Sequence, residues 1–229
     1  MKILALSTAE PGCSLAVMDD DHLVCESFWH SRLTHSRRLL SMAGALFPDQ
    51  AGFEISEVDA VVAARGPGSF TGLRIGISAA LGLATALSRP AVGVSTLDGI
   101  GFRFAMADVP VCAMMDARRG QVYCAVYRFD RGRLQDRTRD RVCAPEQAVA
   151  MVGQTDAVFA GSGVPVYESQ IVEITRNRAR IAPPGMHPVS AAALALSARR
   201  LPGFFENPDN ALVPSYLRSD GADGPRGFA

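Results

Sequence analysis

Short apolar runs alternate with polar turn residues near the start of the chain. The runs at residues 2–7, 13–18 and 23–29 have the length that is typical of strands. The segments 8–12 and 19–21 between them contain the Pro, Gly and Asp residues that favour turns. The pattern predicts two successive hairpins, which together form an antiparallel three-stranded meander.

The spacing of apolar residues then changes to that of a helix. Thr34 begins this pattern and Pro48 ends it, which predicts a helix over residues 34–47. A histidine at the edge of an apolar helix face is more often structural than catalytic, and His35 is interpreted in this way. The apolar face of the predicted helix consists of His35, Leu39, Met42, Ala43 and Leu46.

A strand, a glycine-rich turn and a long helix follow. Residues 58–64 form a bounded apolar run that predicts a buried strand, and Gly66-Pro67-Gly68 predicts a turn. Ser69 or Thr71 can cap the next helix, which is expected to end near Ser88. Small residues recur at every fourth position of this segment: Gly68, Gly72, Gly76, Ala80, Ala84 and Ser88.

This glycine-rich segment has two interpretations. Backbone N–H groups at a helix N-terminus suit anions, so Gly66, Gly68 and Ser69 are candidates for a nucleotide-binding loop. Alternatively, the ridge of small residues allows another backbone to approach the helix closely. No lysine follows the turn, as phosphate-binding loops of the Walker type require, and Lys2 is the only lysine in the chain. The packing interpretation is therefore favoured.

The second half of the chain repeats the alternation of strands and helices in a weaker form. Strands are predicted at 91–94, 111–115, 122–129 and 157–160, and helices at 98–106, 145–152 and 188–200. The arginines between Arg118 and Arg141 are interleaved with aspartates, which favours a solvated hairpin over a nucleic-acid-binding patch. We expect two α/β lobes: residues 1–107 with 188–218 packed back on them, and residues 108–187, followed by a disordered tail at 219–229.

Composition limits the classes of function. The chain has 229 residues, of which 48% are hydrophobic, and its formal net charge is +0. Neutrality argues against a protein that binds nucleic acid on its own, but not against a subunit whose partner holds the nucleic acid. No apolar run reaches membrane-spanning length and no signal peptide is evident, so a cytoplasmic location without membrane association is expected. Five cysteines without C-x-x-C spacing agree with reduced thiols.

Familiar catalytic patterns are missing from the sequence. There is no G-x-S-x-G nucleophile elbow, no H-E-x-x-H metal motif, and no dinucleotide-binding fingerprint after the first strand. The three aspartates at 19–21 are interpreted as a solvated turn rather than a metal site. No catalytic residue, metal ligand or cofactor of the chain's own is predicted.

Several motifs resemble the bacterial TsaB family, also called YeaZ. The resemblance rests on residues 3–9 (ILALSTA), 65–76 (RGPGSFTGLRIG), 93–97 (GVSTL), 116–123 (DARRGQVY) and 216–218 (YLR), in the family's order and spacing. The family is a subunit of the machinery that makes threonylcarbamoyladenosine in tRNA. The resemblance implies an α/β fold of the actin, Hsp70-like and sugar-kinase (ASKHA) superfamily, in which two lobes each contain a mixed β-sheet flanked by helices.

The resemblance also implies that catalysis belongs to a paralogous partner, TsaD, which holds the metal and the nucleotide. TsaD has metal-binding histidines at the places of Thr96 and Ile100, and neither residue here can replace them. Ser7 stands where the family is expected to have an aspartate. The carboxylate of such an aspartate would serve metal or phosphate chemistry, and Ser7 lacks it. The resemblance therefore implies an accessory subunit that binds and activates TsaD, with TsaE as the ATPase and tRNA bound only through the complex.

In the family, the two helices around the glycine-rich turn pack against TsaD, and they are expected to support a homodimer when the partner is absent. The close approach that the glycines allow could be to this partner or to the chain's own sheet. The alternative function is a stand-alone small-molecule kinase or ATPase that uses the turn at 66–72. The expected interface residues are His35, Leu39, Met42, Leu46, Phe70, Gly72, Leu73, Gly76 and Ala80.

Overall fold

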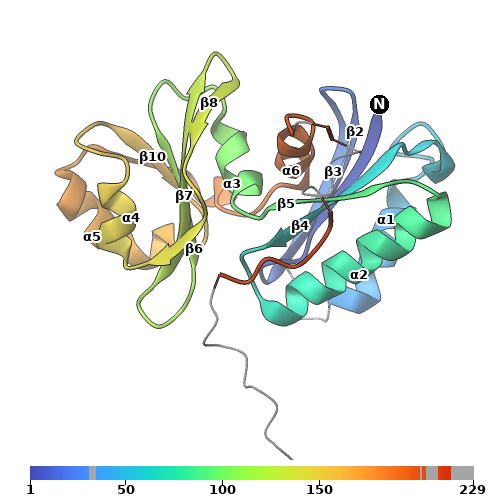
Figure 1. Ribbon diagram of the computed structural model, residues 1–229, viewed down its shortest axis with the longest axis horizontal. Helices are drawn as coiled ribbons and strands as arrows, with labels where there is room; N and C mark the ends of the chain where they lie inside the picture. The colour runs from blue at the N-terminus through green and yellow to red at the C-terminus, as the bar shows by residue number, and fades with distance from the viewer. Residues whose placement is uncertain (31–34, 202, 205–210, 218–229) are drawn as a thin grey trace, which may run out of the picture.

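The computed structural model describes residues 1–30, 35–201, 203–204 and 211–217, and it leaves the side chains of residues 35–38 undescribed. Two β-sheets lie side by side, and helices α3 and α6 lie between them (Figure 1). The predicted tail at 219–229 and the predicted helix start at Thr34 fall outside the described residues. The division into lobes stays a prediction, whereas the presence of two mixed sheets with flanking helices is confirmed.

The first sheet has the strand order β3-β2-β1-β4-β5. Strands β1 (Lys2–Ser7), β2 (Gly12–Asp19) and β3 (His22–His30) form the predicted antiparallel meander. Strands β4 (Ala60–Gly66) and β5 (Ala91–Ser95) extend the sheet in parallel to β1. The carboxyl ends of β1 and β4 therefore lie next to each other, and the glycine-rich turn leaves the sheet there.

Helices cover both faces of this first sheet. Helix α1 (His35–Leu46) and helix α2 (Phe70–Leu87) lie on one face (Figure 1). Helix α6 (Ala191–Ala198) packs on the opposite face and is apolar and buried over almost its whole circumference. Such a helix is stable only inside a core. It is shorter than the predicted segment 188–200 because its cap is Ser190, whose hydroxyl accepts a hydrogen bond of 3.1 Å from the N–H of Ala193.

The second sheet has the order β11-β10-β6-β7-β8, with β9 also paired to β7. The predicted hairpin is present as β6 (Val111–Asp116) and β7 (Val122–Asp130). Three short strands and one helix of this half, β8, β9, β11 and α5, are not predicted by the apolar pattern. The remaining elements are α3 (Asp98–Gly101), β8 (Arg133–Arg137), β9 (Arg141–Cys143), α4 (Pro145–Ala150), β10 (Ala157–Ala160), α5 (Val164–Thr175), β11 (Ala179–Ile181) and short 3-10 turns at Ile55–Glu57, Phe102–Phe104 and Pro184–Met186.

The main core runs from the first sheet into one face of the second. Side chains alternate across a strand, so β7 directs Ala125 and Tyr127 toward α3 and α6, and Cys124 and Val126 toward α4 and α5. Tyr127 is fully buried although it carries a hydroxyl. The two sheets are thus joined by a shared apolar core, and the polar groups inside that core need partners from both halves.

Candidate functional site

The glycine-rich turn is held in place by the chain's own C-terminal segment. Gly66 has a φ of +129°, and a Cβ atom there would lie 2.2 Å from the carbonyl oxygen of Ser215. The N–H of Ser215 donates a hydrogen bond of 2.7 Å to the carbonyl of Arg65. Only glycine fits this backbone conformation and this close approach. The turn is therefore a packing junction between β4, α2 and residues 211–217.

The glycines of α2 face the end of β1. A Cβ atom at Gly72 would lie 2.2 Å from the carbonyl oxygen of Thr8, and one at Gly76 would lie 2.3 Å from its hydroxyl oxygen. That hydroxyl donates a hydrogen bond of 2.7 Å to the carbonyl of Gly72. Of the two alternatives for the small-residue ridge, close approach to the chain's own sheet is the one that the structure shows.

Two N–H groups of the candidate nucleotide-binding loop already donate within the chain. The N–H of Ser69 donates to the carbonyl of Ala9 over 2.8 Å. The N–H of Gly72 donates over 3.3 Å to the hydroxyl of Ser69, which caps α2. An anion at this helix N-terminus would have to compete with both contacts, so the geometry of Gly66, Gly68 and Ser69 favours packing over phosphate binding.

Most of the expected interface residues are buried within the chain. Leu39, Leu46, Leu73, Gly72, Gly76 and Ala80 all belong to the inward faces of α1 and α2. Met42 is half-buried and Phe70 is exposed, with its ring 5.3 Å from that of Tyr216 and the guanidinium of Arg74 3.9 Å above it. The side chain of His35 lies outside the described residues. These inward-facing residues can support a partner surface, but their side chains do not form it.

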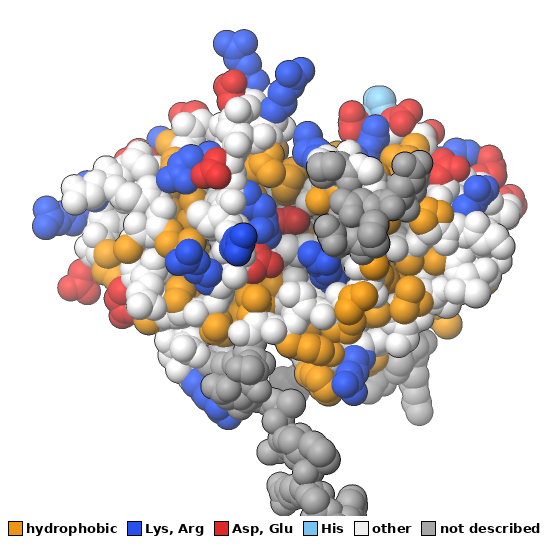
Figure 2. Space-filling model, viewed as in Figure 1, with side chains coloured by type: hydrophobic (Ala, Val, Ile, Leu, Met, Phe, Trp, Pro, Cys, Tyr) orange, Lys and Arg blue, Asp and Glu red, His pale blue; other side chains and the backbone are white. Residues whose placement is uncertain are grey.

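The surface of the two helices consists of other residues, which the sequence analysis did not single out. We define the outer helical face as Leu40, Ser41, Gly44 and Ala45 of α1 and Ser78, Leu81, Gly82, Thr85 and Ala86 of α2, all of which are exposed. Leu40 and Leu81 are 58% and 44% exposed, and a Cβ atom at Gly44 or Gly82 would meet nothing within 4 Å. Apolar side chains are prominent on the surface over α2, with few charged side chains among them (Figure 2).

None of the nine residues of the outer helical face is charged; the side chains of Arg37 and Arg38 in the first turn of α1 lie outside the part that the structure describes. Arg74 is the only charged residue of α2, and it lies in the second turn of the helix. A surface helix of a soluble protein ordinarily carries charges opposite its buried stripe. By length and composition alone α2 could cross a membrane, with a mean hydropathy of 1.5 and 33% of its residues buried; a single helix of this kind is weak evidence for a membrane span. The sequence did contain a signal for this face, because no charged residue follows Arg74 within α2.

A groove adjoins this face at the edge strand β3. It has a volume of about 420 Å³ and lies between Trp29 of β3 and Met42, Ala45 and Leu46 of α1. Trp29 is 48% exposed. Ser27, Ser41 and Gln50 add polar groups to its lining. A half-exposed tryptophan beside such a partly apolar groove is typical of protein interaction sites. Met42, one of the expected interface residues, therefore lies where a partner could reach it.

A cleft opens between the two sheets, where four turns converge. It has a volume of about 570 Å³ and is lined by the β1–β2 turn, the glycine-rich turn, the β6–β7 turn and the turn that precedes α5. Gly68 and Ser69, two of the candidate nucleotide-loop residues, therefore lie at this cleft. Glu10, Asp116 and Arg118 contribute the charged side chains of its lining. Arg118 is highly exposed and pairs with Asp116 over 3.2 Å. The charge that remains in this cleft is negative, which disfavours phosphate groups.

A hydrogen bond crosses the cleft between Glu10 and Ser162. The hydroxyl of Ser162 donates to the carboxyl group of Glu10 and accepts a hydrogen bond of 3.3 Å from the N–H of Asp116. Burial raises the pKa of Glu10, the bond from Ser162 opposes this shift, and the carboxylate of Asp116 adds to it. The contact ties the β1–β2 turn of the first sheet to the turn before α5 in the second.

The two positions at which TsaD is expected to have metal-binding histidines are filled by core residues. Thr96 and Ile100 are both fully buried, and the hydroxyl of Thr96 has no hydrogen-bond partner among the described residues. No group of three His, Cys, Asp or Glu side chains that could hold a metal ion occurs in the part of the chain that the structure describes. The donor set at this place does not fit a metal centre.

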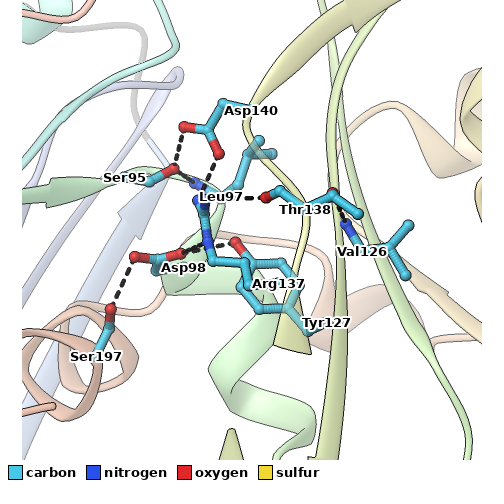
Figure 3. A network of polar contacts seen from close by, with 9 residues as sticks. All are labelled: Ser95, Leu97, Asp98, Val126, Tyr127, Arg137, Thr138, Asp140 and Ser197. Atoms are coloured by element: carbon cyan, nitrogen blue, oxygen red, sulfur yellow. Dashed lines mark hydrogen bonds and ion pairs between the residues drawn. The ribbon is translucent and has the colours of Figure 1, made fainter. Parts of the chain in front are cut away.

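A buried polar network surrounds Asp98 instead (Figure 3). The carboxylate of Asp98 accepts hydrogen bonds from the Tyr127 hydroxyl (2.7 Å), the Arg137 guanidinium (2.9 Å) and the Ser197 hydroxyl (2.8 Å). Arg137 also pairs with Asp140, whose carboxylate accepts a hydrogen bond of 2.7 Å from Ser95. The prediction of a solvated hairpin for the arginine-rich segment was therefore wrong for Arg137 and Asp140, which are largely buried against residues from distant parts of the chain.

Comparison with known proteins gives consistent matches over nearly the whole chain. A family model for TsaD, described as tRNA N6-adenosine threonylcarbamoyltransferase, matches residues 30–223. The tRNA threonylcarbamoyladenosine biosynthesis protein TsaB of Haemophilus influenzae is 32% identical over 232 residues, which cover 96% of this chain and 94% of that protein. TsaB of Bacillus subtilis is 28% identical over 221 residues, which cover 95% and 94%. The structure of YeaZ from Pseudomonas aeruginosa superposes with a TM-score of 0.77 at 31% identity and covers 94% of this chain and 99% of that one.

Proposed function

This chain belongs to the TsaB (YeaZ) family of tRNA threonylcarbamoyladenosine biosynthesis, and we propose that it is a non-catalytic subunit that binds and activates TsaD. Its fold is that of the ASKHA superfamily, with two mixed sheets and flanking helices. TsaE and tRNA then join through the complex, ATP and metal are held by partner subunits, and the chain works in the cytoplasm without membrane association.

The observation that carries this proposal is the uncharged outer helical face. Leu40 and Leu81 expose apolar side chains, and Gly44 and Gly82 leave the helix backbones open to close approach. Small residues at the contact allow two helices to pack at short distance. Water is a poor environment for such a surface, and a second pair of helices would cover it.

The same face explains why TsaD is a suitable partner. The TsaD family model matches residues 30–223 of this chain, so the partner has related helices in a related fold. Two related chains can pair through equivalent surfaces about an approximate two-fold axis. When TsaD is absent, a second copy of this chain can take its place, which gives a homodimer through the same face.

The cleft between the sheets supports a non-catalytic role. Glu10 and Asp116 line it with carboxylates, and the hydrogen bond between Glu10 and Ser162 spans it. Thr96 and Ile100 offer no metal ligands. The alternative, a stand-alone kinase or ATPase that uses the turn at 66–72, needs an anion site that these groups oppose. Calorimetry with Mg-ATP tests it: micromolar binding to the isolated chain would favour the alternative.

Reconstitution tests the main proposal directly. Threonylcarbamoyl incorporation into tRNA is measured with TsaD, TsaE and the enzyme that supplies the activated threonylcarbamoyl group, with and without this chain. We expect activity only when the chain is present, and none from the chain alone. Undiminished incorporation in its absence would contradict the proposed role.

A further inference from the structure

A second cavity lies on the other side of the Glu10–Ser162 contact. It has a volume of about 310 Å³, and Glu10, Pro11 and Ser162 line both this cavity and the cleft described above. The contact is thus a partition between two separate spaces. The rest of the wall is mainly apolar and includes Phe28, Pro165, Pro184, Pro188 and Val189, together with Ser7, Gly12, His30 and His187. The volume and the apolar lining are those of a small-molecule site.

Two polar side chains of this cavity, Glu10 and His187, each make one hydrogen bond to the protein and keep a second polar atom for a ligand. One carboxyl oxygen of Glu10 accepts the hydroxyl of Ser162, and the other has no hydrogen-bond partner among the described residues. His187 is 9% exposed, and its Nδ1 accepts a hydrogen bond of 3.2 Å from the N–H of Gly161. That bond fixes the tautomer with the proton on Nε2. The cavity therefore presents one hydrogen-bond acceptor from Glu10 and one donor from His187.

We propose that this cavity binds a small neutral molecule that has an apolar body and a carboxamide group. The carboxamide NH₂ donates to the free oxygen of Glu10, and its carbonyl oxygen accepts from Nε2 of His187. The apolar body packs against Phe28 and the four prolines of the cavity. A carboxamide is uncharged and carries its donor and its acceptor on two different atoms, so it can contact Glu10 and His187 at the same time.

The electrostatics of the cavity support a neutral ligand. Burial raises the pKa of Glu10 and lowers the pKa of His187, because this enclosed site is a poor environment for charged groups. Asp116 adds to the shift at Glu10, while Glu168 opposes and Arg103 adds to the shift at His187. A carboxylate ligand would meet the carboxyl group of Glu10, which lines the cavity. An ammonium ligand would offer no acceptor to His187.

This site is independent of the proposed partner surface. Its walls come from the β1–β2 turn, β3, the start of α5 and residues 184–189, and they contain no residue of the outer helical face. Occupation of the cavity would hold the first and second sheets together from the side opposite the cleft. A failure of partner binding and a failure of ligand binding can therefore be told apart.

Benzamide is a suitable probe for the full-length chain, with benzoate and benzylamine as charged analogues of the same shape. Titrations followed by ¹H–¹⁵N NMR spectra would give the affinity, and the signals of Gly161 and His187 would report the location. We expect benzamide to bind with a Kd of about 1 mM or tighter, and both charged analogues at least about tenfold more weakly. Equal binding of all three compounds, or shifts away from Gly161 and His187, would overturn the proposal.

Variants separate recognition from mere access to the cavity. Glu10→Leu removes the acceptor and should weaken benzamide binding by about tenfold, whereas Glu173→Leu, at an exposed position of α5, should leave it unchanged. Ser162→Ala keeps the carboxyl group and frees its second oxygen, so it should bind benzamide at least as well as the original chain. Thermal unfolding shows that each variant is folded. Loss of binding in Ser162→Ala but not in Glu10→Leu would contradict the assigned roles.

Discussion

The hydroxyl of Tyr127 donates a hydrogen bond of 2.7 Å to the carboxylate of Asp98, and the two residues belong to different parts of the fold. Tyr127 lies on β7 of the second sheet, whereas Asp98 begins α3, which follows β5 of the first sheet. Both side chains are buried, so neither can exchange this bond for one with water. The pair therefore fixes how the two halves of the shared core meet.

Tyr127→Phe should lower the free energy of unfolding by about 1–2 kcal/mol, because it removes this bond and leaves one donor fewer for the buried carboxylate. The ring contacts with Phe102 and Phe129 are kept. Tyr216→Phe is the matched control because Tyr216 is 45% exposed, and its free energy of unfolding should change by less than about 0.5 kcal/mol. Denaturant titrations of both variants measure the difference. Equal stability of the two would mean that the network contributes little to the contact between the sheets.

Helix α2 permits an internal comparison of two glycines. Gly72→Ala places a Cβ atom 2.2 Å from the carbonyl oxygen of Thr8, which belongs to the backbone and cannot move aside cheaply, so we expect a loss of stability. Gly82→Ala meets nothing within 4 Å and should stabilise the helix by about 0.5–1 kcal/mol. Thermal unfolding of the two variants checks the opposite signs. Stabilisation by Gly72→Ala would show that α2 does not pack closely on the end of β1.

The small-residue ridge of α2 shows which features of the fold can be predicted from the sequence and which cannot. The period of four along α2 predicted close packing correctly, and the meander and the β6–β7 hairpin followed from apolar periodicity. Periodicity does not say whether a helix face meets its own sheet or another chain, because both surroundings favour small apolar residues. Only the structure shows that the ridge faces the chain's own sheet, because Thr8 lies far from Gly72 in sequence and beside it in space.

The missed elements have a related cause. Strand β8 contains a single apolar residue, Leu134, and the strand-disfavouring Asp136, and short strands such as β11 carry too few residues for a periodic signal. The neighbouring Asp136 and Asp140 suggest from the sequence that Arg137 is solvated, yet its guanidinium donates a hydrogen bond to the carboxylate of Asp98. Long-range ion pairs leave no mark in local spacing. The two cavities beside Glu10 were equally hidden, since their walls come from distant segments.

The raised pKa of Glu10 has a consequence for stability. The folded protein binds the proton of Glu10 more tightly than the unfolded chain does. The contribution of Glu10 to the free energy of unfolding is therefore complete below the ordinary pKa of 4.5 and is lost as pH rises through the raised pKa of the folded state. Glu10→Gln keeps an acceptor for Ser162 and cannot ionise. The variant should therefore gain stability relative to the original chain as pH increases above about 4.5. Chemical denaturation between acidic and neutral pH measures the change. A difference that is independent of pH would contradict the burial of this carboxyl group.

A substitution on the outer helical face tests the proposed function most directly. Leu81→Arg places a charge in the middle of an otherwise uncharged surface, where a partner helix would have to bury it. We expect the affinity for TsaD to fall by at least about tenfold and the homodimer to dissociate at lower concentration. Because Leu81 is 44% exposed, the free energy of unfolding should change by less than about 0.5 kcal/mol.

The matched control for this change is Val166→Arg. Val166 is 59% exposed on α5 and lines the cleft between the sheets, so this change adds the same charge at a place where the proposal puts no partner helix. Analytical ultracentrifugation of each variant alone, and calorimetry with TsaD, compare the two sites directly. If Leu81→Arg binds TsaD as tightly as Val166→Arg, then α2 does not form the contact, and the groove between Trp29 and Met42 becomes the next surface to test by the same substitution. If only Leu81→Arg weakens both the homodimer and the complex with TsaD, one face serves both partners, and the two assemblies exclude each other.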